Sequence, residues 1–505
     1  MNRYLLFALS LLLCVSCVEK EPAYRGSPAL QLSVISTTHT TATILIESLN
    51  TDSVYLLCST EEATPSAAAI KADGILAESD SLTLTGLKAS TKYYAYAVGL
   101  QGKDKYSSVV CTDFSTGIIA GDLYSWERAR GEVQVPADIT LCTGGGVPNS
   151  NSWFSIPQNW DAARFAPHVS FDDGTGERWL FDAFLAISGT DASGNNYGIN
   201  NNGRKSADKS SWEAFASYWL EKGGAFDELD KAIAAVAGRI GNPPSKRQVV
   251  MMAPDPVMFE RFTDKNSSTT YWGTLDGNNL DFSKIDDQIK AYIWYADLCR
   301  KKFNNLAPKH LELAGFYILS EELVAKPDGW NYQYKRWDRI LPGFGEYLNE
   351  RNEGLFWIPY RKADGTDLWQ ELGINFAWLQ PNYYWDYNNE QPISGAFPLM
   401  KQWNMGIELE FEYSMVEEVM GTPGIMGPDG AGNYVFTLKD VPSLRSRFRE
   451  YMNGYKSAGL YGKKPIALYS GSNAMYQLGI SKNASDIEMY LELCRFIADN
   501  PIKQK

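Results

Sequence analysis

Two clusters of carboxylates stand out in the C-terminal part of the sequence. Glu321 and Glu322 directly follow an apolar run, and Glu408, Glu410 and Glu412 alternate with apolar residues in the segment IELEFE. Alternation with a period of two is typical of a β-strand, so the second cluster places three acids on one face. Burying carboxylates is costly unless they are paired or protonated. One carboxyl kept protonated and one kept charged are what cleavage of a glycosidic bond requires.

The two clusters predict a general acid and its partner. We assign Glu321 as general acid/base and Glu410 as nucleophile or base, with Glu322, Glu408 and Glu412 as close substitutes. The two carboxyls should lie about 5–5.5 Å apart for retention of configuration, or about 6.5–9.5 Å apart for inversion. The alternative is that the second strand is half exposed and its acids meet solvent, or that Glu408 pairs with a buried arginine.

The elements that must position these acids are strands alternating with amphipathic helices. This alternation predicts a parallel sheet, and eight repeats favour a (β/α)8 TIM barrel over an open doubly wound sheet. The predicted strands cover 138–144, 179–187, 247–254, 311–319, 355–360, 376–382, 406–412 and 465–471. The predicted helices include 211–222, 226–240, 282–303, 334–351, 441–458 and 487–498.

The carboxyl ends of barrel strands form the site, so polar residues there are candidate substrate ligands. Amides and phenols can hydrogen-bond sugar hydroxyls, and an arginine can meet an acidic sugar or orient a carboxylate. For each residue, a loop hydrogen bond or a core aromatic is an equally good interpretation. We expect Asp182, in the middle of a predicted strand, to be a buried structural partner. The substrate-binding candidates are Tyr360, Arg361, Gln380, Asn382, Tyr383, Trp385, Asp386, Asp255 and Glu412.

The first residues predict export and lipidation. A positive Arg3 and a short apolar run precede Val15-Ser16-Cys17, which resembles a bacterial lipobox. We therefore expect a signal peptide over 1–16, a lipid on Cys17 that anchors the chain to the outer membrane at the cell surface, and a tether over 17–27. An ordinary cleaved signal peptide is the alternative.

Residues 28–118 read as an all-β domain. Short alternating strands are separated by turns, and LTLTGL (82–87) followed by TKYYAY (91–96) resembles a fibronectin type III sandwich. In that fold a leucine and a tyrosine near the penultimate strand join the two sheets. Such modules are spacers, and we assign this one no chemistry. Residues 119–505 form the second domain.

Five segments of the second domain carry a further resemblance. They are WLFDAFLAI, SWEAFASYWLEKGGAFDELDKAI, GFYILSEE, LFWIPYRKADG and AWLQPNYYW. In order and spacing they resemble the domain-of-unknown-function 4855 family, over nearly all of residues 140–500. That resemblance implies a glycoside-hydrolase-type barrel and leaves the substrate open. The large retaining-glycosidase clan also keeps its two acids on strands four and seven, but it has Asn where Ser320 precedes Glu321.

Composition excludes several function classes. A net charge of −13 argues against nucleic acid as a partner. Three scattered histidines and no phosphate-binding glycine motif give no support for a zinc site, a Ser-His-Asp triad or a nucleotide, so we expect no cofactor and no metal. The loop 428–433 has some calcium-loop character but lacks the EF-hand register.

Together these features predict a surface-anchored glycoside hydrolase that acts on a polysaccharide or glycoconjugate. The 15 Trp and 29 Tyr suit stacking on sugar faces, although a large core would also use them. The alternative is a non-catalytic carbohydrate-binding lipoprotein on a barrel scaffold, which would keep the cleft but not a working carboxylate pair. A hydrolase for an amide or ester is less well supported, since no G-x-S-x-G elbow is present.

Overall fold

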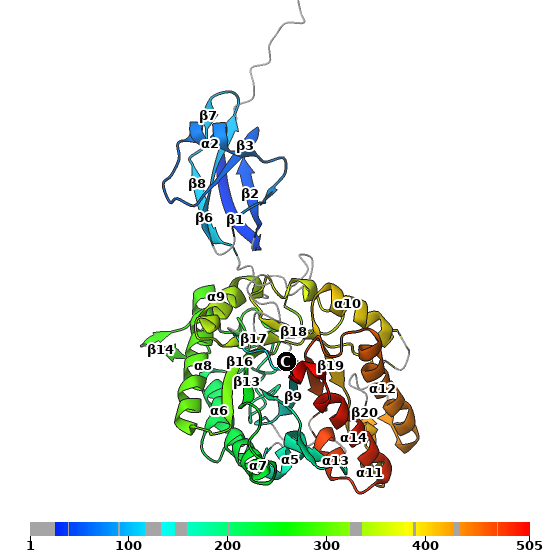
Figure 1. Cartoon of the computed structure of the whole chain (residues 1–505). Coiled ribbons are helices and arrows are strands. Elements are labelled where there is room, and N and C mark those ends of the chain that lie inside the picture. The colour runs from blue at the N-terminus through cyan, green and yellow to red at the C-terminus, as the bar shows by residue number, and fades with distance from the viewer. Residues whose placement is uncertain are drawn as a thin grey trace, which may run out of the picture. The chain divides into compact units, whose positions relative to one another are not determined.

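The structure is a computed structural model, and it divides into two compact units, Met1–Thr116 and Gly117–Lys505 (Figure 1). It describes residues 26–38, 40–88, 91–116, 133–146, 159–199, 203–323, 336–386, 390–428, 435–471 and 473–504. The predicted signal peptide over 1–16, Cys17, most of the predicted tether and all but the first residue of the loop 428–433 lie outside these residues. Within the described part, no helix combines the length and apolarity needed to cross a bilayer.

The N-terminal unit is rich in β-sheet. A three-stranded sheet has the order β1-β2-β5, and a second sheet has the order β4-β3-β6-β7, with β8 also paired to β6. In β2 the alternate residues Ala42, Ile44 and Ile46 are buried, because this face of the strand packs on the opposite sheet. The elements are β1 (Ala29–Thr37), β2 (Ala42–Leu49), β3 (Ser53–Ser59), α2 (Ala67–Asp73), β4 (Ile75–Leu76), β5 (Ser81–Leu84), β6 (Lys92–Gln101), β7 (Lys105–Tyr106) and β8 (Val110–Ser115).

The C-terminal unit contains a closed barrel of eight parallel strands, at the centre of the unit in Figure 1. All eight segments predicted as strands contribute to it, because strands covered on both faces read as continuous apolar runs. Around the barrel the order is β12-β13-β16-β17-β18-β19-β22-β9. The bounds are β9 (Asp138–Thr143), β12 (Ala183–Ile187), β13 (Arg247–Ala253), β16 (Leu311–Ile318), β17 (Gly354–Trp357), β18 (Phe376–Leu379), β19 (Gly406–Glu410) and β22 (Ile466–Tyr469).

Helices lie outside most of the barrel strands, but the repeat is irregular. The connection from β17 to β18 holds only the 3-10 helix η1 (Thr366–Leu368), whereas two helices follow β12 and two follow β22. The helices are α5 (Ala162–Val169), α6 (Lys209–Leu220), α7 (Ala225–Ile240), α8 (Ile285–Leu306), α9 (Trp337–Asn349), η2 (Ile393–Gly395), α10 (Ala396–Gln402), η3 (Tyr413–Met415), α11 (Glu417–Met420), η4 (Leu438–Asp440), α12 (Val441–Ser457), α13 (Ala474–Ile480), α14 (Ala484–Ala498) and η5 (Pro501–Gln504).

Among the described residues of the C-terminal unit, three short antiparallel strand pairs lie outside the barrel, and one of them corrects a strand boundary. Trp179, predicted to begin the second barrel strand, instead ends β11 (Glu177–Trp179), which pairs antiparallel with β10 (Ser170–Asp172). The other pairs are β14 (Thr274–Leu275) with β15 (Asn278–Asn279), and β20 (Gly427–Pro428) with β21 (Val435–Phe436).

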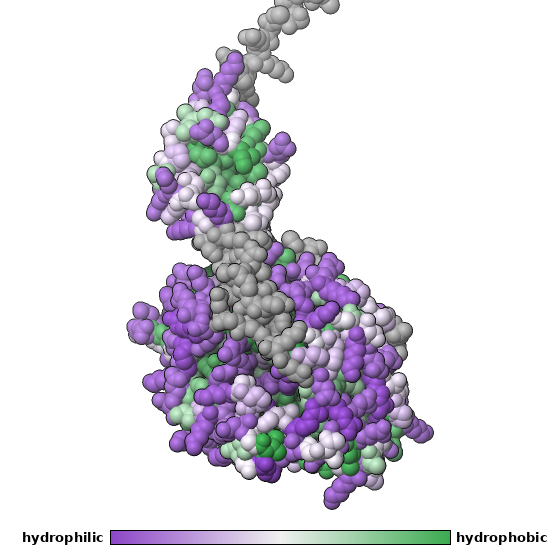
Figure 2. Space-filling view, viewed as in Figure 1, coloured by the Kyte–Doolittle hydropathy of each residue, from purple (hydrophilic) through white to green (hydrophobic). Residues whose placement is uncertain are grey.

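Hydrophilic residues predominate on the face of the barrel unit shown in Figure 2.

A β-bulge in β16 sets which side chains face the barrel interior. Val249 pairs with Leu313 but Val250 pairs with Gly315, so one extra residue is inserted in β16. Gly315 has φ +153°, and a Cβ there would lie 2.0 Å from the Gly354 carbonyl oxygen of the neighbouring strand, so only glycine fits. Beyond the bulge, Tyr317 lines a cavity at the carboxyl end of the barrel.

Candidate active site

A cavity of about 530 Å³ lies at the carboxyl ends of the barrel strands. Its walls combine the side chains of five acidic residues with amides and aromatic rings. This volume lies within the usual range of small-ligand pockets, about 300–1,000 Å³. The residues that line it are Leu141, Ile187, Tyr317, Glu321, Ile358, Gln380, Asn382, Trp385, Asp386, Glu390, Gln391, Glu408, Glu412 and Tyr469.

Glu321 follows β16 and lies at the rim of this cavity. The residue is exposed to solvent, yet protein surrounds its carboxyl within the concave wall, and this desolvation raises its pKa to about 7. Among the described residues, no cation pairs with it and no hydrogen bond to it stabilises the charged form. A carboxyl in this setting holds a proton near neutral pH and can donate it.

The three acids of β19 and its extension differ in depth. Glu408 is 2% exposed and forms part of the cavity floor. Burial raises its pKa well above the usual range, and the charges of Glu410 and Glu321 raise it further. The protonated form of Glu408 is therefore favoured over the charged form.

Glu410 is fully buried and does not line the cavity. Its Oε2 accepts hydrogen bonds from the Asn382 backbone N–H and the Tyr451 hydroxyl, both at 2.7 Å. Burial raises its pKa to about 8, although these two hydrogen bonds oppose the shift. The geometry therefore places Glu410 in the wall behind Asn382, where it holds the β18 loop, and not in the cavity where it was predicted to attack substrate.

Glu412 is half-buried and lines the cavity. Burial raises its pKa to about 7, while hydrogen bonds from the Tyr469 hydroxyl, at 3.2 Å, and the Tyr413 backbone favour its charged form. Its carboxylate rests on Gly471, which has φ +55° and where a Cβ would lie 1.9 Å from Glu412 Oε2. The carboxylate of Glu412 can occupy this position only because residue 471 has no side chain.

Besides Glu412, four of the predicted ligands line the same cavity. Gln380 Nε2 donates to Asn382 Oδ1 at 2.9 Å, and this orients both amides at the end of β18. Trp385 packs edge-on against the Tyr469 ring, with centroids 6.0 Å apart. Asp386 accepts the backbone N–H groups of Glu390 at 2.9 Å and Gln391 at 2.5 Å. The β18 loop therefore presents amides, a ring and carboxylates together.

Other predicted residues lie away from this cavity. Glu322 and Tyr360 line a second cavity, where the Tyr360 hydroxyl donates to Glu322 Oε1 at 3.0 Å. Arg361 donates to the Pro392 carbonyl at 3.0 Å, so it holds a loop.

Two further candidates serve the scaffold. Tyr383 donates to Glu450 Oε2 at 2.5 Å, on the side of α12. Asp255 is buried and accepts hydrogen bonds from the Ser320 hydroxyl at 2.5 Å and the Ile199 N–H at 3.1 Å. Asp255 thus supports the segment that carries Glu321.

Four polar or aromatic lining residues were missed by sequence reasoning. Tyr469 lies near the end of the eighth predicted strand (465–471) and ends β22, so the rule that strand ends form the site would have found it. Tyr317 lies within the fourth predicted strand, where its direction depends on the bulge. Glu390 and Gln391 follow in the β18 loop and carry no local signal, because Asp386 brings them to the cavity.

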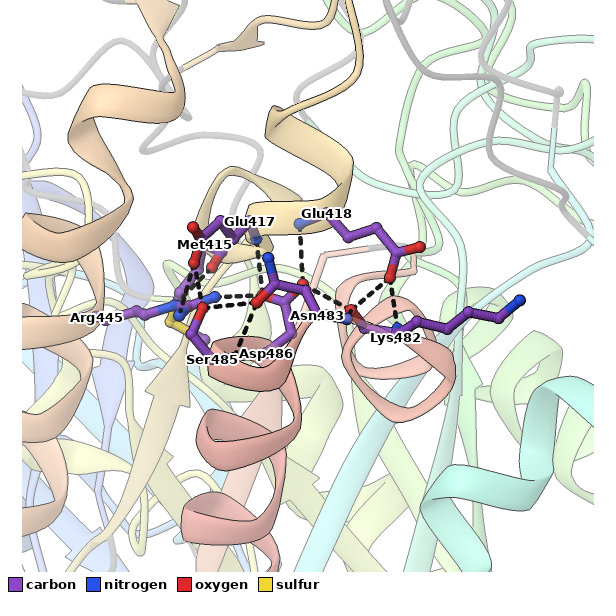
Figure 3. Close-up of polar contacts among 9 residues, drawn as sticks. Met415, Glu417, Glu418, Arg445, Lys482, Asn483, Ser485 and Asp486 are labelled. Carbon is purple, nitrogen blue, oxygen red and sulfur yellow. Dashed lines mark hydrogen bonds and ion pairs between the residues drawn. The ribbon is translucent and has the colours of Figure 1, made fainter.

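A polar cluster fixes the segment that follows Glu412 (Figure 3). Asp486 of α14 forms an ion pair with Arg445 of α12 and accepts the N–H groups of Glu417 at 2.7 Å and Glu418 at 2.9 Å. Arg445 Nε also donates to the Met415 carbonyl at 3.1 Å. These contacts join η3 and α11 to two outer helices, so the chain leaves the cavity along a fixed path.

Comparison with known proteins places the barrel unit in a family. The family model described as "Domain of unknown function (DUF4855)" matches residues 151–423, which confirms the resemblance over a shorter range than 140–500. No curated protein matches the chain.

Solved structures with similarity include a computationally redesigned β-sandwich protein, at 24% identity over 19% of this chain and 99% of that one, with a TM-score of 0.15. The fn3 domain of human collagen alpha-1(XX) chain is 14% identical over 20% of this chain and 91% of that one, with a TM-score of 0.15. A structure described as "Myokine structure" is 13% identical over 18% of this chain and 98% of that one, with a TM-score of 0.15.

Proposed function

The chain belongs to the DUF4855 family, and from that premise we propose that it is a glycoside hydrolase acting on a polysaccharide or glycoconjugate. The observation that carries the proposal is that Glu321, Glu408 and Glu412 line one cavity together with amides and aromatic rings. Hydrogen-bonding amides and flat rings suit a polyhydroxylated ring with apolar faces. On this proposal the closed parallel barrel is a (β/α)8 barrel of the glycosidase type.

The two catalytic roles fall to Glu321 and Glu412. Desolvation raises the pKa of Glu321 to about 7, and no hydrogen bond from a described residue opposes the shift, so Glu321 is suited to be the acid. The charged form of Glu412 is favoured by Tyr469 and by a backbone N–H, so Glu412 is suited to be the nucleophile or base. Burial favours the protonated form of Glu408, which also lines the cavity, so Glu408 is suited to donate a hydrogen bond to substrate. This assignment moves the second role from Glu410 to Glu412.

The reaction consumes one water per bond cleaved. Glu321 gives its proton to the glycosidic oxygen, the bond from that oxygen to the anomeric carbon breaks, and the leaving sugar departs with a hydroxyl. The Glu412 carboxylate either bonds to the anomeric carbon or takes a proton from the water whose oxygen bonds there. In the first case water later releases the sugar, with Glu321 acting as base.

The N-terminal unit and the leader fit an enzyme held at a surface. Its two sheets and the Tyr93 hydroxyl, which accepts the Lys88 N–H at 2.8 Å near the start of β6, support a fibronectin type III-like sandwich. We assign that unit a spacer role. The lipobox-like sequence ending at Cys17 supports lipidation and an outer-membrane location. Loss of palmitate-analogue labelling in Cys17→Ala tests this assignment.

Digestion of a glycan panel tests the enzymatic proposal. The chain from Cys17 onward is incubated with neutral and acidic glycans, and products are read by mass spectrometry. We expect cleavage of at least one glycan and a loss of about 10³-fold or more in kcat for both Glu321→Gln and Glu412→Gln. The matched control is Glu410→Gln, which we expect to retain much more activity.

Two outcomes contradict the proposal. If the chain binds a glycan but cleaves none, it is the carbohydrate-binding protein of the alternative interpretation. If Glu410→Gln abolishes cleavage and Glu412→Gln does not, the original assignment of the second carboxylate is restored. Proton NMR of the first product anomer then separates retention from inversion.

A further inference from the structure

A second cavity of about 420 Å³ shares Glu321 with the first. It is lined by the loop after β12 and by the segment after β16. Gly189, Thr190 and Asn196 come from the first of these, and Glu322 from the second. Tyr360, at the end of the strand next to β16, completes the polar wall. Glu321 thus stands at the boundary between two pockets of comparable size.

We infer that the second cavity is the leaving-group subsite, which takes at least one further neutral sugar unit of the substrate. This inference rests on the proposed hydrolase function. A general acid must reach the glycosidic oxygen, and that oxygen lies between the sugar that is attacked and the sugar that leaves. An acid shared by two cavities therefore places the scissile bond at their boundary.

The distribution of carboxylates sets the direction of the substrate. Glu408 and Glu412 line only the first cavity, so the attacked anomeric carbon belongs there. Apart from the shared Glu321, the described lining of the second cavity contains a single carboxylate, Glu322. Glu322 already accepts a hydrogen bond from Tyr360, which suits a positioning role better than attack.

The walls of the second cavity indicate the chemical class of the leaving sugar. Thr190, Asn196 and Tyr360 offer hydroxyl and amide groups, and Glu322 accepts donors. Leu319 and Ile199 add apolar surface. Hydroxyls of a neutral sugar satisfy such a site, whereas a sugar carboxylate or sulfate would face Glu321 and Glu322. The described lining holds no Lys or Arg that would offset this repulsion.

Gly189 offers a way to fill this cavity without disturbing the fold. The residue is exposed, and a Cβ built on it has no neighbour within 4 Å. Gly189→Phe therefore projects a ring into open space. Gly238, on the exposed side of α7, also has no neighbour within 4 Å of a built Cβ, so Gly238→Phe is the matched control.

The test compares two substrates that share the glycone part. One is the oligosaccharide that the panel identifies as cleaved, and the other is the dinitrophenyl glycoside of its glycone fragment, whose leaving group needs neither an acid nor a sugar subsite. We expect Gly189→Phe to lower the ratio of kcat/KM for the oligosaccharide to that for the aryl glycoside by about tenfold or more. Gly238→Phe should leave this ratio as in the wild type.

The other possible results contradict the proposed function, the subsite or the neutral class of the leaving sugar. If the wild type cleaves no glycan, the proposed function fails and the subsite fails with it. If the wild type is active but Gly189→Phe leaves the ratio unchanged, the subsite alone is wrong. If products always carry a charged sugar on the leaving side, the neutral class is wrong. Circular dichroism and thermal unfolding confirm that both variants are folded.

Discussion

The two ends of the barrel differ in whether their acidic residues are paired with a cation. At the amino end, Lys503 Nζ lies 2.6 Å from Asp138 and 3.3 Å from Asp182, and Arg247 lies 2.5 Å from Asp182. At the carboxyl end, Glu408, Glu410 and Glu412 have no cation partner among the residues that the structure describes. The same scaffold therefore holds acids paired at one end and acids without counter-charge at the other.

The difference separates structural acids from candidate catalytic ones. Burial raises the pKa of Asp138 to about 6, but Lys503 opposes the shift and keeps the carboxylate available as an ion. Burial raises the pKa of Glu412, which lines the cavity, to about 7 with only hydrogen bonds to oppose it. Acids kept protonated in a cavity serve proton transfer, whereas paired acids serve the fold. Asp182, predicted to be a buried structural partner, is half-buried and belongs to the paired end.

Removing the cation at the amino end should have the largest effect on stability. Lys503→Met keeps most of the stem of the side chain but leaves Asp138 buried without its ion pair. We expect a loss of about 3–5 kcal/mol in the free energy of unfolding, measured in urea. The loss should be smaller at acidic pH, where Asp138 is protonated. Glu410→Gln is the control at the other end, and an equal loss there would contradict the comparison.

Adding one methyl group under Glu412 should cost activity more than stability. Gly471→Ala places a Cβ where the Glu412 carboxylate now lies, so that carboxylate must move. A displacement of about 1 Å in a catalytic group can cost about 10²-fold in rate, and we expect a loss of that size in kcat. If Gly471→Ala retains activity while Glu412→Gln is inactive, catalysis does not require the exact position of the Glu412 carboxylate.

The carboxyl-end acids should also make stability depend on pH. The folded-state pKa of Glu410, about 8, lies above its usual value of 4.5, so the folded protein holds a proton that the unfolded chain releases. The contribution of Glu410 to the free energy of unfolding is therefore fully present below about pH 4.5 and is lost as the pH rises toward 8. Glu410→Gln should reduce this slope by up to about 1.4 kcal/mol per pH unit, measured by urea unfolding across that window. An unchanged slope would show that Glu410 is ionised when folded.

Sequence reasoning predicted the strands well because barrel strands are apolar on both faces. It also placed Glu321, Glu408 and Glu412 near one another, since the carboxyl ends of parallel strands meet at one edge. It could not predict the bulge in β16, because the extra residue depends on contact between Gly315 and Gly354 of a neighbouring strand. The irregular helix pattern likewise depends on loop packing.

The roles within the site were harder to predict than its members. Alternation along β19 gives the side of the strand but not the depth, so Glu408, Glu410 and Glu412 looked equivalent. Tyr451, which fixes Glu410, comes from α12, a distant segment of the chain. Tyr469, which favours the charge on Glu412, comes from another strand. Long-range partners, and not local pattern, distinguish the three acids.

The smallest predicted effect sharpens the comparison at the catalytic end. Tyr469→Phe removes the hydroxyl that donates to Glu412 at 3.2 Å, so the charged form of Glu412 loses a stabilising contact. Its pKa, about 7 in the wild type, should rise, and the acidic limb of the rate–pH profile should move to higher pH. We expect a movement of about half a pH unit to one unit, the equivalent of one hydrogen bond. Tyr317→Phe, in the same cavity, should move that limb less. A limb that moves equally in both variants would mean that the Tyr469 hydroxyl does not set the charge of Glu412, and another group must then distinguish it from Glu408 and Glu410.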